Sequence, residues 1–224
     1  MYKKRKEFFM MKKNGFTLAE VLITLAIIGV VATLTLPSLM TNTGEQQAVT
    51  AYRKAINTLN EAGQMSAAVD GFDYSQLSDG ATPPSAASTL DENGIPKQSL
   101  WSLLVNRTQV DIPASVAAKV PGECNGKSQV FFRDGTVLCY TPAVTAGANA
   151  DIQAFIDTNG TKGPNLLSTC GDEQCLQGQR SIKDQFRVTL HGSNAIPGHV
   201  TWANGVPTED QSNAGFAARW AMRK

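Results

Sequence analysis

The sequence lacks the residue patterns that enzymes commonly use for catalysis. Its only two histidines, His191 and His199, lie on different predicted strands and form no HExxH pair. It has no Gly-x-Ser-x-Gly turn for a serine nucleophile, and no glycine-rich loop ending in Gly-Lys-Ser or Gly-Lys-Thr to hold a phosphate. We interpret both histidines as surface or edge-strand residues, and we expect neither an enzymatic activity nor a cofactor.

Net charge is also low, but the charges are unevenly distributed. The formal net charge of the whole chain is +1. The first 15 residues carry six basic side chains and one acidic side chain, whereas the rest of the chain carries 14 basic and 18 acidic side chains. A mildly acidic body gives no electrostatic reason to expect a nucleic-acid partner. The basic N-terminal end is typical of the cytoplasmic flank of a membrane segment.

Cysteines are few, and all four lie in the distal half of the chain: Cys124, Cys139, Cys170 and Cys175. Neither sequence-local pair has the CxxC spacing of common zinc sites, which disfavours the alternative of four cysteines around zinc. Outside the cytoplasm an even number of cysteines indicates disulfides, and four cysteines allow three pairings. We favour the two sequence-local disulfides, although the spacing leaves the pairing open.

Charge is absent from one long stretch near the N-terminus. No charged residue occurs between Glu20 and Glu45, and residues 21–36 are all apolar, glycine or threonine. As an α-helix, the 21 residues that start at Phe16 would extend about 30 Å, the thickness of the bilayer core. A cleaved secretory signal usually has a shorter apolar stretch and an Ala-x-Ala-like site, which does not follow here. A plain signal anchor would leave Glu20 unexplained.

The residues around Glu20 form a motif. Two lysines and Gly15 precede the letters FTLAE, and a long apolar run follows directly. This arrangement resembles the class III signal of type IV pilins and pseudopilins. A proline is common in that family at the twenty-second mature position, which Pro37 occupies if the mature chain begins at Phe16. The rest of the chain agrees with the family only in general layout.

The resemblance implies processing at the N-terminus. A prepilin peptidase would cut between Gly15 and Phe16 on the cytoplasmic side and methylate the new amino group of Phe16. The leader would then have 15 residues, which is longer than the leader of many members. Alternative translation starts at Met10 or Met11 would shorten it, in the latter case to MKKNG.

Glu20 needs an explanation because a carboxylate in hydrocarbon costs at least ~2.5 kcal/mol. After the cut it would be the fifth residue of the mature chain, where that family has a glutamate. We hypothesise that Glu20 forms an ion pair with the free amino group of Phe16 in a neighbouring subunit, which would set the register between subunits. Pro37 is expected to kink or locally melt the helix, since it lacks an N–H group and clashes with the preceding turn.

The resemblance further implies an α+β, pilin-like fold, in which a long N-terminal helix packs on an antiparallel sheet with a loop-rich, disulfide-bearing distal part. Residues 1–15 would be the leader, residues 16–44 the transmembrane and filament-core helix, and residues 45–224 a domain in the periplasm or at the cell exterior. The implied function is a structural subunit of a type II secretion pseudopilus or a type IV pilus.

The implied partners are other pilin subunits, the prepilin peptidase, and an inner-membrane assembly platform with a separate ATPase. The rival interpretation is a monomeric, membrane-anchored binding domain that does not polymerise. Such a domain would share the anchor but would not need the processing motif.

The body begins with a second helical pattern. Its apolar positions fall on one helical face, which predicts a half-buried amphipathic helix over residues 45–68. These positions are Val49, Tyr52, Ile56, Leu59 and Gly63. Glycine, proline, serine and aspartate are frequent in residues 70–98, which predicts a long loop. Ser99 is a candidate N-cap for a short helix after that loop.

Asp134 and Gly135 separate two runs rich in valine, phenylalanine and tyrosine. Such a dipeptide predicts a β-hairpin with a two-residue type I′ turn. The paired strands would be residues 129–133 and 136–140. Further strands are predicted at residues 185–191 and 199–204, and a short helix at the C-terminus.

One loop offers candidate metal ligands. Asp157, Asn159 and Thr161 alternate around Gly160, and alternating oxygen ligands suit a hard cation such as calcium. A hydrogen-bonded Asx turn explains the same residues. Calcium binding by these three residues is a prediction that calorimetry can test.

Overall fold

The computed structural model describes residues 15–77, 98–111, 120–141, 151–203 and 205–223. The chain divides into two compact units between Thr43 and Gly44. One helix, α1 (Leu18–Val69), contributes its first part to the N-terminal unit and its remainder to the second unit, which we call the body. The helix is continuous through Pro37, so of the two expected effects local melting does not occur, because a proline removes only one N–H group and the turns on either side keep theirs; a kink at Pro37 stays a prediction.

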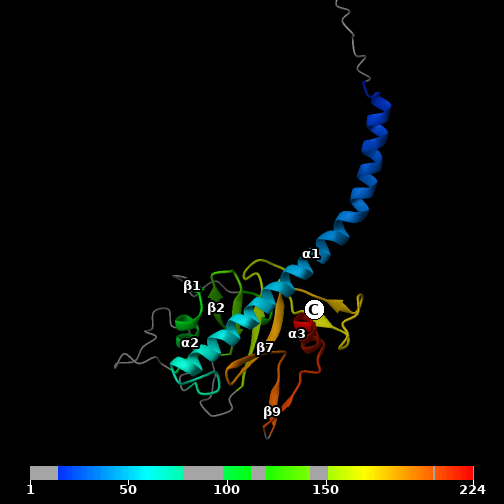
Figure 1. Cartoon of the computed structure of the whole chain (residues 1–224). Coiled ribbons are helices and arrows are strands. Elements are labelled where there is room, and N and C mark those ends of the chain that lie inside the picture. Colours follow the sequence, from blue (N-terminus) through cyan, green and yellow to red (C-terminus); the bar gives the residue numbers. More distant parts are fainter. Residues whose placement is uncertain (1–14, 78–97, 112–119, 142–150, 204, 224) are drawn as a thin grey trace, which may run out of the picture. The chain divides into compact units, whose positions relative to one another are not determined.

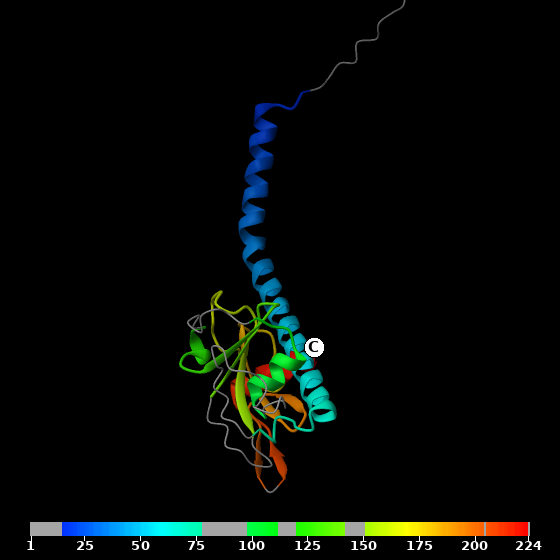
Figure 2. The ribbon, with the colours of Figure 1, turned by 90° about the vertical axis from the view of Figure 1, so that its left-hand side faces the viewer.

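A six-stranded antiparallel sheet forms the centre of the body (Figure 1). Its strands are β1 (Val110–Asp111), β2 (Ser128–Phe132), β3 (Val137–Tyr140), β4 (Ile152–Asp157), β7 (Gln185–His191) and β8 (Asn194–Pro197), in that spatial order. The part of α1 within the body runs along one side of the sheet, as Figure 2 shows. Together with the two disulfides, this arrangement confirms the predicted α+β, pilin-like architecture.

Smaller elements surround this sheet. They are α2 (Leu100–Arg107), the 3₁₀ helix η1 (Gly122–Cys124), the paired strands β5 (Thr169–Cys170) and β6 (Arg180–Ser181), the paired strands β9 (Thr201–Ala203) and β10 (Val206–Thr208), and α3 (Asn213–Arg223). The predicted cap of α2 is confirmed, since the Ser99 side chain accepts a hydrogen bond from the Ser102 amide at 3.1 Å. The strand predicted at 199–204 is shorter, and Asn204 lies outside the described residues.

The predicted amphipathic stripe on α1 is confirmed. All five of its residues are buried: Val49, Tyr52, Ile56, Leu59 and Gly63. The ring of Tyr52 stacks on Phe186 of β7 with 4.5 Å between centroids, and its hydroxyl donates a hydrogen bond to the Arg187 carbonyl at 2.8 Å. The helix is thus fixed to the sheet by burial and by one satisfied buried hydroxyl.

The hairpin of β2 and β3 is confirmed, but the predicted turn type is wrong. Gly135 has a positive φ of 90°, whereas Asp134 is not among the described residues with positive φ, as a type I′ turn would require. The Gly135 amide donates to the Phe132 carbonyl at 3.0 Å, which closes a type I turn followed by a left-handed glycine. The Asp134 carboxylate accepts the Thr136 amide at 3.0 Å and so favours this turn.

The loop predicted at residues 70–98 is described only up to Leu77, and residues 78–97 lie outside the described part. Residues 70–77 have no helix or strand, as expected. However, Phe72, Tyr74 and Leu77 are buried in the main core. The Tyr74 hydroxyl donates to the Leu59 carbonyl at 2.6 Å. The start of this loop is therefore part of the core and covers the end of α1.

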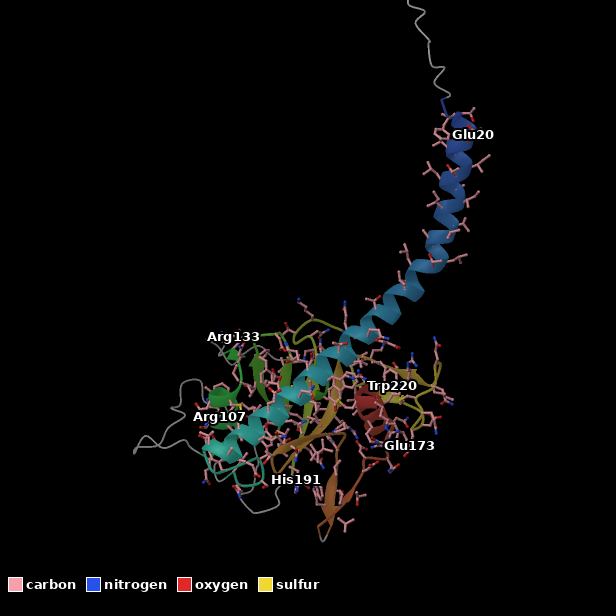
Figure 3. The ribbon with its side chains drawn as sticks, in the orientation of Figure 1. Glu20, Arg107, Arg133, Glu173, His191 and Trp220 are labelled. Atoms are coloured by element: carbon pink, nitrogen blue, oxygen red, sulfur yellow. A yellow bond between two sulfur atoms is a disulfide. The ribbon has the colours of Figure 1, made fainter. Side chains whose placement is uncertain are left out.

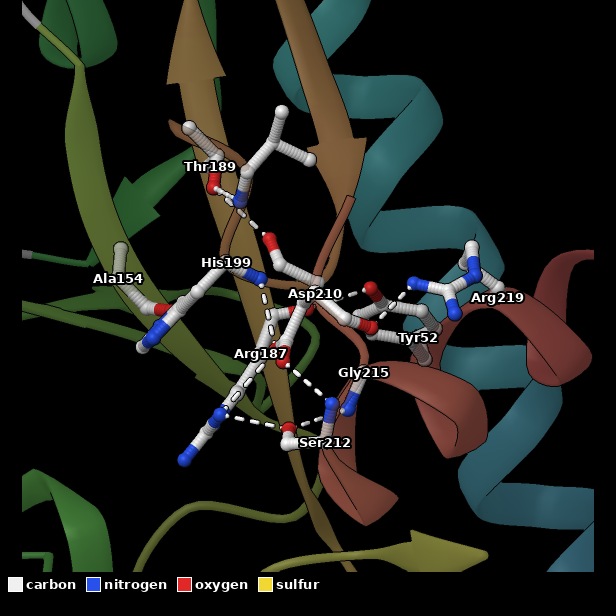
Figure 4. Close-up of polar contacts among 11 residues, drawn as sticks. Tyr52, Ala154, Arg187, Thr189, His199, Asp210, Ser212, Gly215 and Arg219 are labelled. Carbon is white, nitrogen blue, oxygen red and sulfur yellow. Dashed lines mark hydrogen bonds and ion pairs between the residues drawn. The ribbon is translucent and has the colours of Figure 1, made fainter. Parts of the chain in front are cut away.

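A polar network around Asp210 holds α3 against the sheet (Figure 4). The Asp210 carboxylate accepts hydrogen bonds from Arg187 and from the His199 amide, both at 3.1 Å, while its carbonyl accepts Arg219 at 2.6 Å. Burial opposes ionisation of Asp210, but hydrogen bonds from Ser212 and His199 outweigh it and hold the pKa of this carboxyl below its usual range. The network joins β7, the segment before β9, and α3.

Candidate processing and assembly site

The predicted cleavage point lies just before α1. Gly15 and Phe16 have no regular structure, and the Phe16 side chain is 89% exposed. Residues outside regular structure with exposed side chains are accessible to a peptidase. The other leader residues, 1–14, lie outside the described part of the chain, and cleavage with methylation of Phe16 stays a prediction.

Thr17 and Glu20 close the first turn of α1 through reciprocal hydrogen bonds. The Glu20 carboxylate accepts the Thr17 amide at 2.8 Å and the Thr17 hydroxyl at 2.9 Å. In return, the Glu20 amide donates to the Thr17 hydroxyl at 3.2 Å. This is a capping box, which satisfies amides that the first helical turn leaves without partners. Figure 3 labels Glu20 at the start of the helix.

The capping box is compatible with processing. The amide that donates to Glu20 belongs to the peptide bond between Phe16 and Thr17, which a cut after Gly15 leaves intact. Both hydrogen bonds from Thr17 go to Oε2 of Glu20, and within the described residues no donor reaches Oε1. The second oxygen can therefore accept a group from outside the subunit. The letters TLAE fit the Ser/Thr-x-x-Glu pattern of a capping box, a signal that we did not recognise in the sequence.

The helix that follows is suited to a membrane by length and composition. The stretch Leu18–Leu36 contains 19 residues and is the one candidate span among the described helices. Its threonine hydroxyls bond to carbonyls of the same helix: Thr24 to Val21, Thr33 to Val30 and Thr35 to Val31, at 2.8–3.0 Å. Because these hydroxyls are satisfied internally, the threonines do not expose free donors to lipid.

The cysteines of the body are paired in the sequence-local way. Cys124 of η1 is joined to Cys139 of β3, and Cys170 is joined to Cys175 in the loop after β5. All four cysteines are consumed, so no thiolate remains for the zinc alternative. The first disulfide lies in a smaller core cluster, which is separate from the main core of the body.

The candidate calcium loop forms the alternative Asx turn. Oδ1 of Asp157 accepts the amides of Asn159 and Gly160 at 3.1 and 2.7 Å, and Oδ2 accepts the Gln185 side chain at 2.9 Å. Thr161 is exposed. Burial raises the pKa of Asp157 to about 6. Since both oxygens already accept N–H groups, the geometry favours a structural role, and calcium binding stays an untested prediction.

Both histidines are half-buried, so their interpretation as surface or edge-strand residues was wrong. His191 lies on the interior strand β7, where its Nδ1 is 2.7 Å from Asp151 and its ring stacks on Trp202. His199 lies before β9, with its Nε2 3.1 Å from the Ala154 carbonyl, and burial lowers its pKa. Within the described residues, no group of three or more His, Cys, Asp or Glu side chains could hold a metal ion.

Comparison with known families bears on the N-terminal site. Residues 10–36 match the family model described as the prokaryotic N-terminal methylation motif. The chain carries a prepilin-type methylation motif. The matched segment includes the predicted cut, the capping box and the apolar span, and it confirms the resemblance to type IV pilins and pseudopilins. The methylation motif is a feature of filament precursors rather than of enzymes. Neither a curated protein nor a solved structure matches the chain.

Proposed function

We propose that this protein is a structural subunit of a type IV filament, made as a membrane-anchored precursor. The observation that carries the proposal is the methylation motif at residues 10–36, which contains a candidate span whose only acidic residue, Glu20, accepts hydrogen bonds from Thr17. The subunit would belong to a type II secretion pseudopilus or a type IV pilus. Its role would be structural and not enzymatic.

Before assembly, the apolar span would hold the subunit in the inner membrane with its basic leader in the cytoplasm. The disulfides support a body on the opposite side, because disulfides persist in the oxidising periplasm and at the cell exterior. The hydrogen bonds from Thr17 lower the cost of keeping the Glu20 carboxylate at the membrane boundary. The prepilin peptidase would cut the leader at this stage.

During assembly, Oε1 of Glu20 would accept a hydrogen bond from the amino group of Phe16 of a neighbouring subunit. A charge buried in the dry filament core without a partner is strongly destabilising. Because Glu20 and the amino group meet in only one register between neighbouring subunits, this contact would select that register. The apolar side chains of residues 18–36 would leave lipid and pack on other subunits. A separate ATPase on the assembly platform would drive the process.

The decisive experiment is the mass of the mature N-terminus, measured on the chain expressed with a prepilin peptidase. We expect a chain that begins with N-methylated Phe16. A Gly15→Val variant is the matched control and should keep its leader. An uncut leader on the unchanged chain would overturn the proposal and favour the rival, a monomeric membrane-anchored binding domain.

A further inference from the structure

The body contains a cavity that the proposed function does not use. It has a volume of about 540 Å³ and lies between α1, the C-terminal end of α2 and the β2–β3 turn. Lys54, Ala55 and Thr58 of α1 line one wall, and the buried Phe132 lies against it from β2. This volume is within the range of ligand sites in proteins, and it can admit one or two side chains of a partner.

The rim of this cavity is basic, and one of its cations has no acidic partner among the residues that the structure describes. Lys54 forms an ion pair with Asp134 at 2.9 Å, and Arg107 binds Asp70 through two hydrogen bonds. Arg133 is exposed, and no acidic side chain pairs with it within the described residues. The cavity therefore offers a free guanidinium, which prefers a carboxylate as its partner.

One exposed acid that could complement this cation lies on the far side of the body. The disulfide between Cys170 and Cys175 closes a small loop that presents Glu173, which is exposed. The other acid of the loop, Asp172, is used internally, because its carboxylate accepts the Cys175 amide at 2.8 Å. No basic side chain pairs with Glu173 within the described part of the body. Figure 3 shows Arg107 and Arg133 at one edge of the body and Glu173 at the opposite edge.

The acidic loop is also held rigidly. Arg180 donates to the Cys175 carbonyl at 3.4 Å and to Glu45 of α1 at 3.2 Å, and its guanidinium stacks on Trp220. A loop that is already ordered loses little entropy when it binds.

We propose that the basic cavity of one body binds the Cys170–Cys175 loop of a second copy of this chain, with Glu173 paired to Arg133. Two different surfaces on opposite edges make a heterologous contact, which repeats from copy to copy instead of closing a dimer. The proposal rests on the proposed function and names the contact between bodies that would accompany the contact between helices.

Charge reversal tests the pairing in full-length chains expressed with the assembly machinery. We expect Arg133→Glu and Glu173→Arg each to lower the yield of sheared filaments about tenfold or more, and the double variant to restore it. Lys162→Glu reverses an exposed lysine elsewhere on the body and is the matched control, with normal yield expected. The mass of the mature N-terminus is measured in the same cells.

Normal assembly of both single variants would overturn the proposal while leaving the filament function intact. Loss of assembly that the double variant does not restore would also overturn it. A second measurement tests the pairing even if a charge-reversed variant fails to fold. The conservative variant Arg133→Lys is treated with a zero-length carbodiimide, which should join the amine introduced at position 133, or that of Lys54, to Glu173 of the next copy. The cross-link should disappear when Glu173→Gln is added, and its persistence would contradict the pairing.

Discussion

The carboxylate of Glu20 accepts the amide of Thr17 at 2.8 Å, while the amide of Glu20 donates to the hydroxyl of Thr17 at 3.2 Å. These reciprocal hydrogen bonds give Glu20 a structural role within its own chain, because they cap the N-terminus of α1. The proposed ion pair gives it a second task between subunits. The two tasks differ in what they need, because a cap needs only an acceptor oxygen, whereas an ion pair needs the charge.

Substitutions at these two positions separate the tasks. Glu20→Gln keeps an acceptor for the Thr17 amide but removes the charge, and we expect it to lower filament yield as much as Glu20→Ala. Thr17→Ala keeps the charge and costs about 0.5–2 kcal/mol of helix stability, so it should lower the yield much less. Filament yield is measured by shearing and immunoblotting. Normal assembly of Glu20→Gln would show that the cap alone matters.

Gly63 allows α1 to approach the turn between β7 and β8. A Cβ atom at this position would lie 2.6 Å from the Ser193 carbonyl oxygen and 2.7 Å from the Tyr74 ring. We therefore expect Gly63→Ala to lower the free energy of unfolding of the body by about 1–3 kcal/mol. Urea unfolding followed by tryptophan fluorescence in detergent measures this.

Gly44→Ala is the control for this prediction, because a Cβ at Gly44 meets nothing within 4 Å. Gly44 lies inside α1, so the alanine should be neutral or stabilise the helix by up to about 1 kcal/mol. Equal effects of the two substitutions would contradict the close packing at Gly63.

The raised pKa of Asp157 makes the stability of the body depend on pH. Between its ordinary pKa of 3.8 and its folded pKa of about 6, the folded body holds a proton that the unfolded chain releases. The resulting stabilisation of the folded body is fully present below pH 3.8 and is lost as the pH rises through about 6. The free energy of unfolding should fall by on the order of 2–3 kcal/mol over this range. Asp157→Asn should remove this decline when unfolding is measured from pH 4 to pH 7.

Asp134→Asn is a control in which the pH dependence of stability has the opposite sign. Burial opposes ionisation of Asp134, but hydrogen bonds from Lys54 and Thr136 outweigh it and lower its pKa. Its contribution is therefore present above pH 3.8 and is lost as the pH falls through its folded pKa. A variant of Asp157 that keeps the full pH dependence of the unchanged chain would show that another group causes it.

The two disulfides should differ in what their removal costs. The bridge from Cys124 to Cys139 spans 15 residues and the bridge from Cys170 to Cys175 spans five. A disulfide stabilises mainly by constraining the unfolded chain, and more so for a longer loop. Replacing the pair by alanine should therefore lower the free energy of unfolding by about 3 kcal/mol for the longer bridge and by about 2 kcal/mol for the shorter one. Thermal unfolding of the two double variants tests the order. A larger loss for the shorter bridge would indicate that Arg180 and its contacts depend on that loop.

The sequence correctly predicted the elements that depend on residues close together in the chain. The stripe from Val49 to Gly63 and the N-cap at Ser99 were correct because each depends on neighbours within a few residues. The hairpin at Asp134 was located correctly, but its turn type was not. An Asp-Gly pair fits more than one turn, and here the Thr136 hydrogen bonds select the type I turn.

Contacts between distant segments could not be predicted in this way. Phe72 and Tyr74 were assigned to a polar loop because serine, glycine and proline surround them, yet they fill the core under α1. The pairing of Arg187 with Asp210, and the approach of Gly63 to Ser193, join segments far apart in the chain. No spacing rule relates such residues, since only the folded sheet brings them together.

The sequence by itself determined the N-terminal part of this protein: an apolar span, a single acid at its start, and a methylation motif that depends only on adjacent letters. It also favoured disulfides over a zinc site for the four cysteines, without fixing their pairing. The tertiary structure alone placed Arg133 at a cavity and Glu173 at the opposite edge. A helix in lipid depends on its own residues, whereas a surface depends on which distant segments the sheet brings side by side.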